Sequence, residues 1–154
     1  MVLKGSLVDL GGVAGALRIE GNREYIFAYA AAAETVGKVR VITFDGDEET
    51  NPTASAPATQ TTVYQLVGVA TKTTTAAGFL WYQIKGDAEA LVEGTTNVAK
   101  DDFLQVLNAE TSFKKDGASI TTEACAIAQE AQTADSSVLT NVYLFGERVF
   151  IAAS

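Results

Sequence analysis

Residues 78–106 (GFLWYQIKGDAEALVEGTTNVAKDDFLQV) constrain the fold more than any other part of the chain. They predict two apolar strands, at residues 79–85 and 88–93, with Gly86-Asp87 breaking the run between them. A turn-rich stretch then leads into a third strand. Closely spaced strands joined by short turns are typical of a small β-barrel.

The two predicted strands differ in how many of their faces are apolar. Within residues 88–93, three side chains that point one way alternate with three that point the other (Ala88, Ala90 and Val92 against Glu89, Leu91 and Glu93), so one face is packed and the other mostly wet. Residues 79–85 carry large apolar groups on both faces and need cover on both sides. We expect a neighbouring layer or another subunit to supply it, with candidate subunit-interface residues Phe79, Trp81 and Tyr82.

The composition fits one all-β domain. A chain of 154 residues buries roughly 70% of its unfolded surface, and its Thr and Val content favours strands over long helices. Further strands are predicted at residues 23–29, 38–44, 64–71, 103–107, 123–131, 140–145 and 148–151. Propensity alone also allows a helix at residues 30–33 and at 123–131, but the alternation of Cys125, Ile127 and Gln129 favours a strand in the second case. A turn is expected near residues 34–37, and a charged hairpin near residues 114–117.

The N-terminal residues 1–21 are rich in glycine and show no sustained period, so we interpret them as an extended arm before a single β-rich domain at residues 22–154. A phosphate-binding loop at residues 11–15 is disfavoured because no Gly-Lys-Ser/Thr follows. Residues 45–56 resemble a calcium loop in carboxylate spacing, but Thr50 and Ala56 stand where an EF-hand needs Gly and Glu. A solvated loop is the better interpretation, followed by an extended strap at residues 51–61.

Charge and residue inventory disfavour several function classes. The net charge of −8 argues against nucleic acid as a partner. The absence of His removes the commonest general base and metal ligand, and the single Cys125, expected to be buried, cannot form an internal disulfide. We therefore expect no cofactor and no metal site. No secretory leader and no apolar run of membrane-spanning length is visible, so no membrane association is expected.

Catalysis is not expected either. Without His there is no Ser/His pair, and the adjacent Asp101 and Asp102 point apart on a strand or tight turn, which does not suit a glycosidase acid and base. Trp81 and Tyr82 could form a sugar-stacking platform, but in so apolar a strand a core or subunit interface is the better interpretation.

Four segments of this chain resemble the capsid decoration, or cement, proteins of tailed bacteriophages. They are LVGVA at residues 66–70, the segment 78–106, ACAIAQEA at 124–131 and NVYLF at 141–145, so the resemblance covers roughly the last 90 residues. It implies a small β-barrel or β-sandwich of the β-tulip kind. It also implies a non-enzymatic protein on the outside of an icosahedral head, made in the host cytoplasm, often trimeric, that clamps neighbouring major capsid subunits.

On this hypothesis the N-terminal arm faces the capsid. Residues 1–40 carry five basic and four acidic side chains, whereas the remainder of the chain carries a net charge of −9. The candidate capsid contacts are Leu3, Lys4, Leu7, Leu10, Val13, Leu17 and Arg18. The rival hypotheses are a carbohydrate-binding β-module, a receptor-adhesion domain on a virion, and a small β-barrel enzyme.

A fold without metal or disulfide has a simple experimental consequence. We expect the melting temperature to be unchanged by EDTA and by a reducing agent, since the chain has no His and one Cys. Differential scanning calorimetry with and without each reagent measures this, and a fall of many degrees in EDTA would contradict it.

Overall fold

The computed structural model describes residues 14–44, 51–117 and 123–151, and every regular element in them is a β-strand. The strands are β1 (Leu17–Glu20), β2 (Arg23–Ala30), β3 (Val39–Thr43), β4 (Thr53–Ser55), β5 (Gln60–Ala70), β6 (Gly78–Glu93), β7 (Phe103–Gln105), β8 (Lys114–Lys115), β9 (Ala126–Ala128), β10 (Ser137–Phe145) and β11 (Arg148–Ile151). The predicted all-β class is confirmed.

Five of these strands close into a barrel in the order β2-β4-β3-β5-β6, and β6 pairs back with β2. The β2–β4 pair is parallel, and the other four pairs are antiparallel. Because the five strands form a closed ring, their backbone N–H and C=O groups pair with neighbouring strands on both sides. Small β-barrels avoid exposed, unpaired strand edges in this way. The prediction of a small β-barrel is therefore confirmed.

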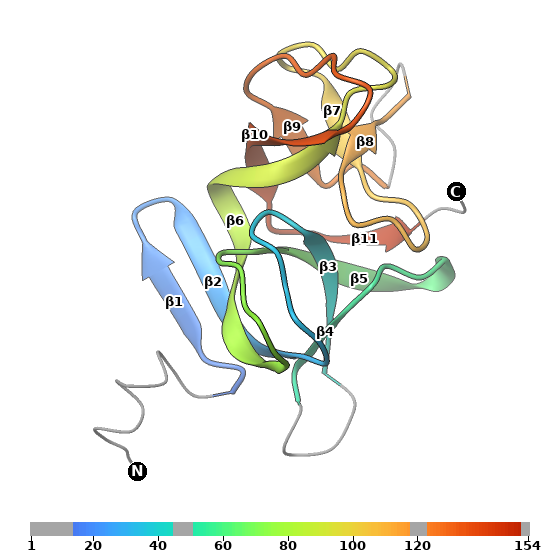
Figure 1. The fold of residues 1–154 in the computed structure, drawn as a ribbon. Helices are drawn as coiled ribbons and strands as arrows, with labels where there is room; N and C mark the ends of the chain where they lie inside the picture. Colours follow the sequence, from blue (N-terminus) through green and yellow to red (C-terminus); the bar gives the residue numbers. More distant parts are fainter. Residues whose placement is uncertain (1–13, 45–50, 118–122, 152–154) are drawn as a thin grey trace.

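The second half of β6 leaves the barrel and enters another set of strands. There it pairs with β10, and the order continues through β9 and β7 to β8. Figure 1 shows β6 running between the barrel and the upper group of strands, with the β1–β2 hairpin on one side and β11 against β5 on the other. One strand thus belongs to both halves of the molecule.

The predicted break at Gly86-Asp87 is wrong, because β6 is one continuous strand of 16 residues. Gly86 has a φ of 89° and directly follows the β2–β6 register shift, which lies between the pairs Tyr25↔Gln83 and Glu24↔Lys85. A β-bulge of this kind bends a strand without ending it, and glycine takes the left-handed conformation at little cost. The Gly-Asp signal marks a bend between two sets of partners.

Two other segments differ from the prediction. Residues 17–20 form β1, so the irregular arm is wrong there; residues 1–13 lie outside the described part of the chain. Gly21-Asn22 joins β1 to β2 as a two-residue hairpin, with a φ of 62° at Gly21. The strap expected at residues 51–61 instead contributes β4 and the first residues of β5. β4 pairs with β2 on one side and with β3 on the other, so it completes the barrel between them.

The remaining strand predictions hold with changed lengths. The strand at residues 123–131 shortens to β9, and the turn between β2 and β3 lies at Val36-Gly37. Lys114 and Lys115 form β8, which pairs with β7, and Asp116-Gly117 follow it without regular structure. Residues 118–122, where a returning strand of that hairpin would lie, and the acidic residues 45–50 are outside the described residues.

The barrel interior is filled by small and medium side chains and one large one. Its buried apolar members are Ile26, Ala28, Ala30, Ile42, Ala54, Leu66, Ala70, Leu80, Tyr82 and Ile84. Gly68 makes room for Tyr82, since a Cβ on Gly68 would lie 3.2 Å from the Cβ of Tyr82.

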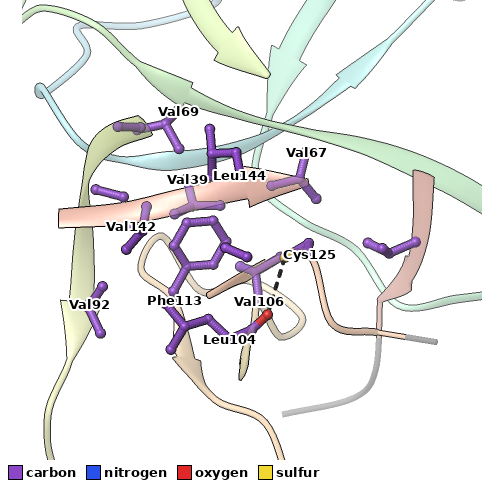
Figure 2. Close-up of a cluster of buried hydrophobic side chains, with 14 of the residues drawn as sticks. Val39, Val67, Val69, Val92, Leu104, Val106, Phe113, Cys125, Val142 and Leu144 are labelled. Atoms are coloured by element: carbon purple, nitrogen blue, oxygen red, sulfur yellow. Dashed lines mark hydrogen bonds between the residues drawn. The ribbon is translucent and has the colours of Figure 1, made fainter. Parts of the chain in front are cut away.

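A second core lies between the outer face of β3 and β5 and the second group of strands. Figure 2 shows Phe113 among Val39, Val69, Val142 and Leu104. Cys125 belongs to this core at 4% exposure, and its Sγ donates to the Leu104 carbonyl at 3.6 Å. The prediction of a buried cysteine is confirmed, and burial raises the pKa of the Cys125 thiol to about 12.

The bend in β6 provides a direct test of the fold. A Cβ on Gly86 would lie 2.3 Å from the Asn22 carbonyl oxygen, in addition to the strain of a positive φ. We expect Gly86→Ala to lower the free energy of unfolding by about 2 kcal/mol or more, measured by urea denaturation. Gly117→Ala is the matched control, because no atom lies within 4 Å of a Cβ there. Equal stability of the two variants would contradict the role given to Gly86.

Candidate functional site

The described residues contain no group of three or more His, Cys, Asp or Glu side chains placed to hold a metal ion. Asp102, one of the two adjacent carboxylates, accepts from the Ala99 amide at 2.8 Å and from Lys115 Nζ at 2.8 Å. These contacts, that with Lys115 first, lower the pKa of Asp102, and they tie the turn before β7 to β8. Its role in this geometry is structural.

Aromatic side chains cover the outer face of the barrel where β2 pairs with β6. Phe27 stacks on Phe79 with ring centroids 5.4 Å apart and contacts Trp81 at 5.0 Å. The guanidinium of Arg18, on β1, lies 4.4 Å from the Tyr25 ring centroid and 4.7 Å from that of Trp81. Such cation–π contacts stabilise the face by about 0.5–2 kcal/mol each and fix Arg18 in place.

The cover expected over residues 79–85 is therefore supplied largely by this chain itself. Leu80 and Ile84 lie inside the barrel, and Phe79 and Trp81 are half-buried on its outer face. Phe79 and Trp81 remain candidate subunit-interface residues. Tyr82 does not, because its side chain is 0% exposed within the barrel, so that part of the interface prediction is wrong. The sugar platform of Trp81 with Tyr82 fails for the same reason, since adjacent strand residues point to opposite faces.

A buried polar cluster occupies one end of the barrel. Glu34 is 2% exposed and accepts hydrogen bonds from Arg40 Nε at 2.9 Å, from Arg40 Nη2 at 2.9 Å and from the Tyr82 hydroxyl at 2.8 Å. Burial raises the pKa of Glu34, but the hydrogen bonds from Arg40 and Tyr82, with the charge of Arg40, outweigh it, so the net pKa lies below 4.5. The same surroundings raise the pKa of Tyr82. We call this the Glu34 cluster.

The edge strand β1 displays uncovered apolar side chains. Leu17 and Ile19 are 65% and 69% exposed, whereas most large apolar side chains of β2 are buried. Leu17 lies opposite Ile26 and Ile19 opposite Glu24, so both point to the side of β2 that faces the barrel interior. β4 takes over the edge of β2 beyond β1, so β1 stands beside the barrel instead of closing it. Figure 1 shows β1 as the outermost strand on that side.

Of the seven candidate capsid contacts, the structure describes two. Leu17 is exposed on β1, while Arg18 packs on Tyr25 and Trp81 and pairs with Glu20 at 3.3 Å. The other five (Leu3, Lys4, Leu7, Leu10 and Val13) lie outside the described residues.

A polar groove of about 450 Å³ lies at the bend of β6, where the barrel meets the second group of strands. Asp87 is one of its lining residues and accepts from Asn22 Nδ2 at 2.8 Å and from Gln129 Nε2 at 2.6 Å. These hydrogen bonds lower the pKa of Asp87 and keep its carboxylate charged. Gln83 donates to the backbone carbonyls of Lys85 and Asp87 at 3.0 and 2.7 Å, which fixes the bulge.

Sequence reasoning did not identify the Glu34 cluster or this groove. A glutamine inside the apolar run 79–85, and another at residue 129 in a predicted strand, were the available signals for the groove. Neither shows which side chains from other strands lie beside it, because that depends on the pairing of β6 with β2 and β10.

Comparison with known proteins does not place the chain in a family. No family model matches it, and no curated protein matches it significantly. In the described part of the chain, no helix is long and apolar enough to cross a membrane.

The Glu34 cluster generates a stability prediction with a pH dependence. We expect Tyr82→Phe to lower the free energy of unfolding at pH 7 by about 1.5–3 kcal/mol, the contribution of a hydrogen bond to a charged group. Tyr29→Phe is the control, since the Tyr29 hydroxyl has no hydrogen-bond partner among the described residues. Urea denaturation of the three proteins gives the comparison, and equal losses in the two variants would contradict the role of the hydroxyl.

The difference between wild type and Tyr82→Phe depends on pH. The pKa of Glu34 is lower in the folded than in the unfolded chain, so its stabilising effect is present above about 4.5 and is lost as the pH falls through the folded value. Removing the hydroxyl raises the folded pKa and reduces this effect. The stability difference should therefore shrink below pH 4.5, and a difference constant from pH 7 to pH 3 would argue against Glu34 as its source.

Proposed function

We propose that the chain is a structural protein that decorates and stabilises the outer surface of an icosahedral phage head by clamping neighbouring major capsid subunits. The observation that carries the proposal is the exposed apolar pair Leu17 and Ile19 on the edge strand β1. An edge strand offers unpaired backbone groups as well as side chains, and exposed apolar groups on such an edge favour association with another chain.

The segments that resemble decoration proteins lie mainly in the long central strands β5, β6 and β10, which we call the frame of the molecule. Residues 66–70 lie in β5, residues 78–93 form β6 and residues 141–145 lie in β10, which pairs with β6. The resemblance therefore concerns the strands that join the barrel to the second group of strands. β1 precedes all of these segments and lies at the margin of the frame, which suits an attachment element.

The energies favour attachment as an oligomer. Burying the exposed parts of Leu17 and Ile19 stabilises a contact by about 2–4 kcal/mol. Association costs about 4–15 kcal/mol in translational and rotational freedom, so one such contact does not hold a monomer on a surface. Three copies joined in a trimer act together through effective concentration. Of the possible oligomers, the resemblance to decoration proteins favours a homotrimer, with Phe79 and Trp81 as candidate subunit-interface residues.

Two substitutions on β1 test the attachment. We expect Leu17→Thr with Ile19→Thr to reduce occupancy on phage heads assembled from the proposed partner, a major capsid protein. The dissociation constant should rise about tenfold or more, because the apolar contribution of each copy is lost. Threonine keeps the β-branched character that strands favour, so the fold should be unchanged by far-UV circular dichroism.

Val138→Thr is the control, since Val138 is 43% exposed on β10, away from β1. Occupancy is measured as copies per head by quantitative mass spectrometry and located by cryo-electron microscopy. The proposal fails if the wild-type chain is absent from purified heads or if the β1 variant binds as well as the control.

A further inference from the structure

The groove at the bend of β6 is built by a row of side chains that crosses four strands. Arg18 lies directly opposite Tyr25, Tyr25 opposite Gln83, and Gln83 opposite Val69, on β1, β2, β6 and β5 respectively. Directly opposed residues share one face of a sheet, so this row forms a continuous floor on the outside of the barrel. The side chain of Gln83, 7% exposed, lies in its middle.

The second group of strands supplies the facing wall. After the bulge, Glu89 and Asn141 are directly opposed on β6 and β10, and the Gln129 amide donates to the Asn141 carbonyl at 2.9 Å. Asp87 joins floor to wall, because Gln83 donates to its carbonyl and Gln129 to its carboxylate. The polar groups are thus held by hydrogen bonds before any ligand arrives, which lowers the entropic cost of binding.

Several of these groups retain unused hydrogen-bonding capacity. Among the described residues, the side chains of Glu89 and Asn141 and the Oε1 atom of Gln83 have no hydrogen-bond partner. Arg23, exposed at the rim, adds a further donor. Together they offer three acceptor groups (Glu89, Gln83 Oε1 and Asn141 Oδ1) and two donor groups (Asn141 Nδ2 and Arg23), while Val36, Val69 and Ala88 add small apolar surfaces.

The charged side chains that line the groove favour a ligand without net charge. Arg18 and Arg23 are balanced by Asp87 and Glu89, so an anion meets two carboxylates and a cation meets two guanidinium groups. A neutral molecule with many hydroxyl groups uses both kinds of partner, and its C–H faces pack on the apolar surfaces. The volume of about 450 Å³ lies within the range of small-molecule sites and accommodates a single sugar ring.

We infer that this groove is a binding site for one neutral sugar ring, with Glu89, Asn141 and Gln83 as its hydrogen-bonding residues. The inference is independent of the attachment function of β1, since the two sites use different side chains. It also differs from the sugar platform considered for Trp81 with Tyr82, because neither of those two residues lines the groove.

The test is an NMR titration of the full chain with glucose, galactose and N-acetylglucosamine, followed through side-chain amide signals. At least one sugar should shift the amide signals of Gln83, Gln129 and Asn141 saturably at concentrations up to about 10 mM, the range that detects millimolar affinity. Methyl glycosides of the same sugars separate two sources. Equal binding indicates the end of a glycan chain, and loss of binding indicates a free sugar.

Variants connect the binding to the named residues. Glu89→Gln and Asn141→Ala each change an exposed side chain, and each should weaken binding about tenfold without altering the melting temperature. Glu147→Gln, an exposed change on the turn between β10 and β11, should bind as the wild type does. The inference is overturned if no sugar gives saturable shifts at these amides, if inorganic phosphate or calcium shifts them while the sugars do not, or if Glu89→Gln and Asn141→Ala leave the affinity unchanged.

Discussion

The structure depends on one strand pairing with two different sets of partners. Through residue 85, β6 is hydrogen-bonded to β2, and from Lys85 onward it is hydrogen-bonded to β10, with the left-handed Gly86 at the change. A straight strand cannot follow both partners, since each sheet imposes its own twist. The bulge bends β6 so that it can pair with β2 on one side of the bend and with β10 on the other. The barrel core therefore lies on one side of the bend and the second core on the other, with the polar groove at the bend itself.

The barrel interior shows how a small closed sheet handles a large polar side chain. Burying the Tyr82 ring is favourable by about 2–3 kcal/mol, but an unpaired buried hydroxyl costs about 1–3 kcal/mol and cancels much of that gain. Glu34 removes the penalty by accepting a hydrogen bond from the hydroxyl, and Arg40 then balances the carboxylate with two further hydrogen bonds. The cost of removing the two charges from water makes the net contribution of the Glu34–Arg40 pair to the free energy of folding small. The main effect of the cluster is to fix the positions of the groups it connects.

That position matters for the loops at this end of the barrel. The Glu34 amide donates to Thr74 Oγ1 at 2.9 Å, and the Thr74 amide donates to the Glu34 carbonyl at 2.9 Å. The loop between β2 and β3 and the loop between β5 and β6 are therefore tied to each other and, through the Glu34 side chain, to Tyr82 in the core. A chain with a single Cys has no internal disulfide, so contacts of this kind fix its loops.

Local patterns in the sequence predicted what depends on local chemistry. The alternation in residues 88–93 predicted the buried and wet faces of β6 correctly, and the tendency of free Cys to be buried predicted the burial of Cys125. The side of β6 on which Tyr82 lies was not predictable in this way, because residues 79–85 are apolar on both faces. The gap that admits Tyr82 is created by Gly68 on a different strand.

Other features were missed because a local signal has two meanings. The dipeptide Gly86-Asp87 is compatible with either a turn or a β-bulge, and only the pairing of the strands on either side decides between the two. Gly21-Asn22 was a usable hairpin signal for β1, but the glycine content of residues 1–21 concealed it. Glu34 and Arg40, like the groove residues, are brought together by the register of strands that are far apart in the chain.

The exposed face of β1 requires a balance between attachment and unwanted association. An edge strand with two uncovered apolar side chains invites pairing with any other strand edge. Here the strand is only four residues long, and Arg18 and Glu20 alternate with Leu17 and Ile19. Because charged side chains and short length weaken edge pairing, and a net charge of −8 keeps copies apart, contacts through this edge stay weak between free molecules. Such an edge acts strongly only where many copies meet a repeated surface, which is the setting that the proposed function supplies.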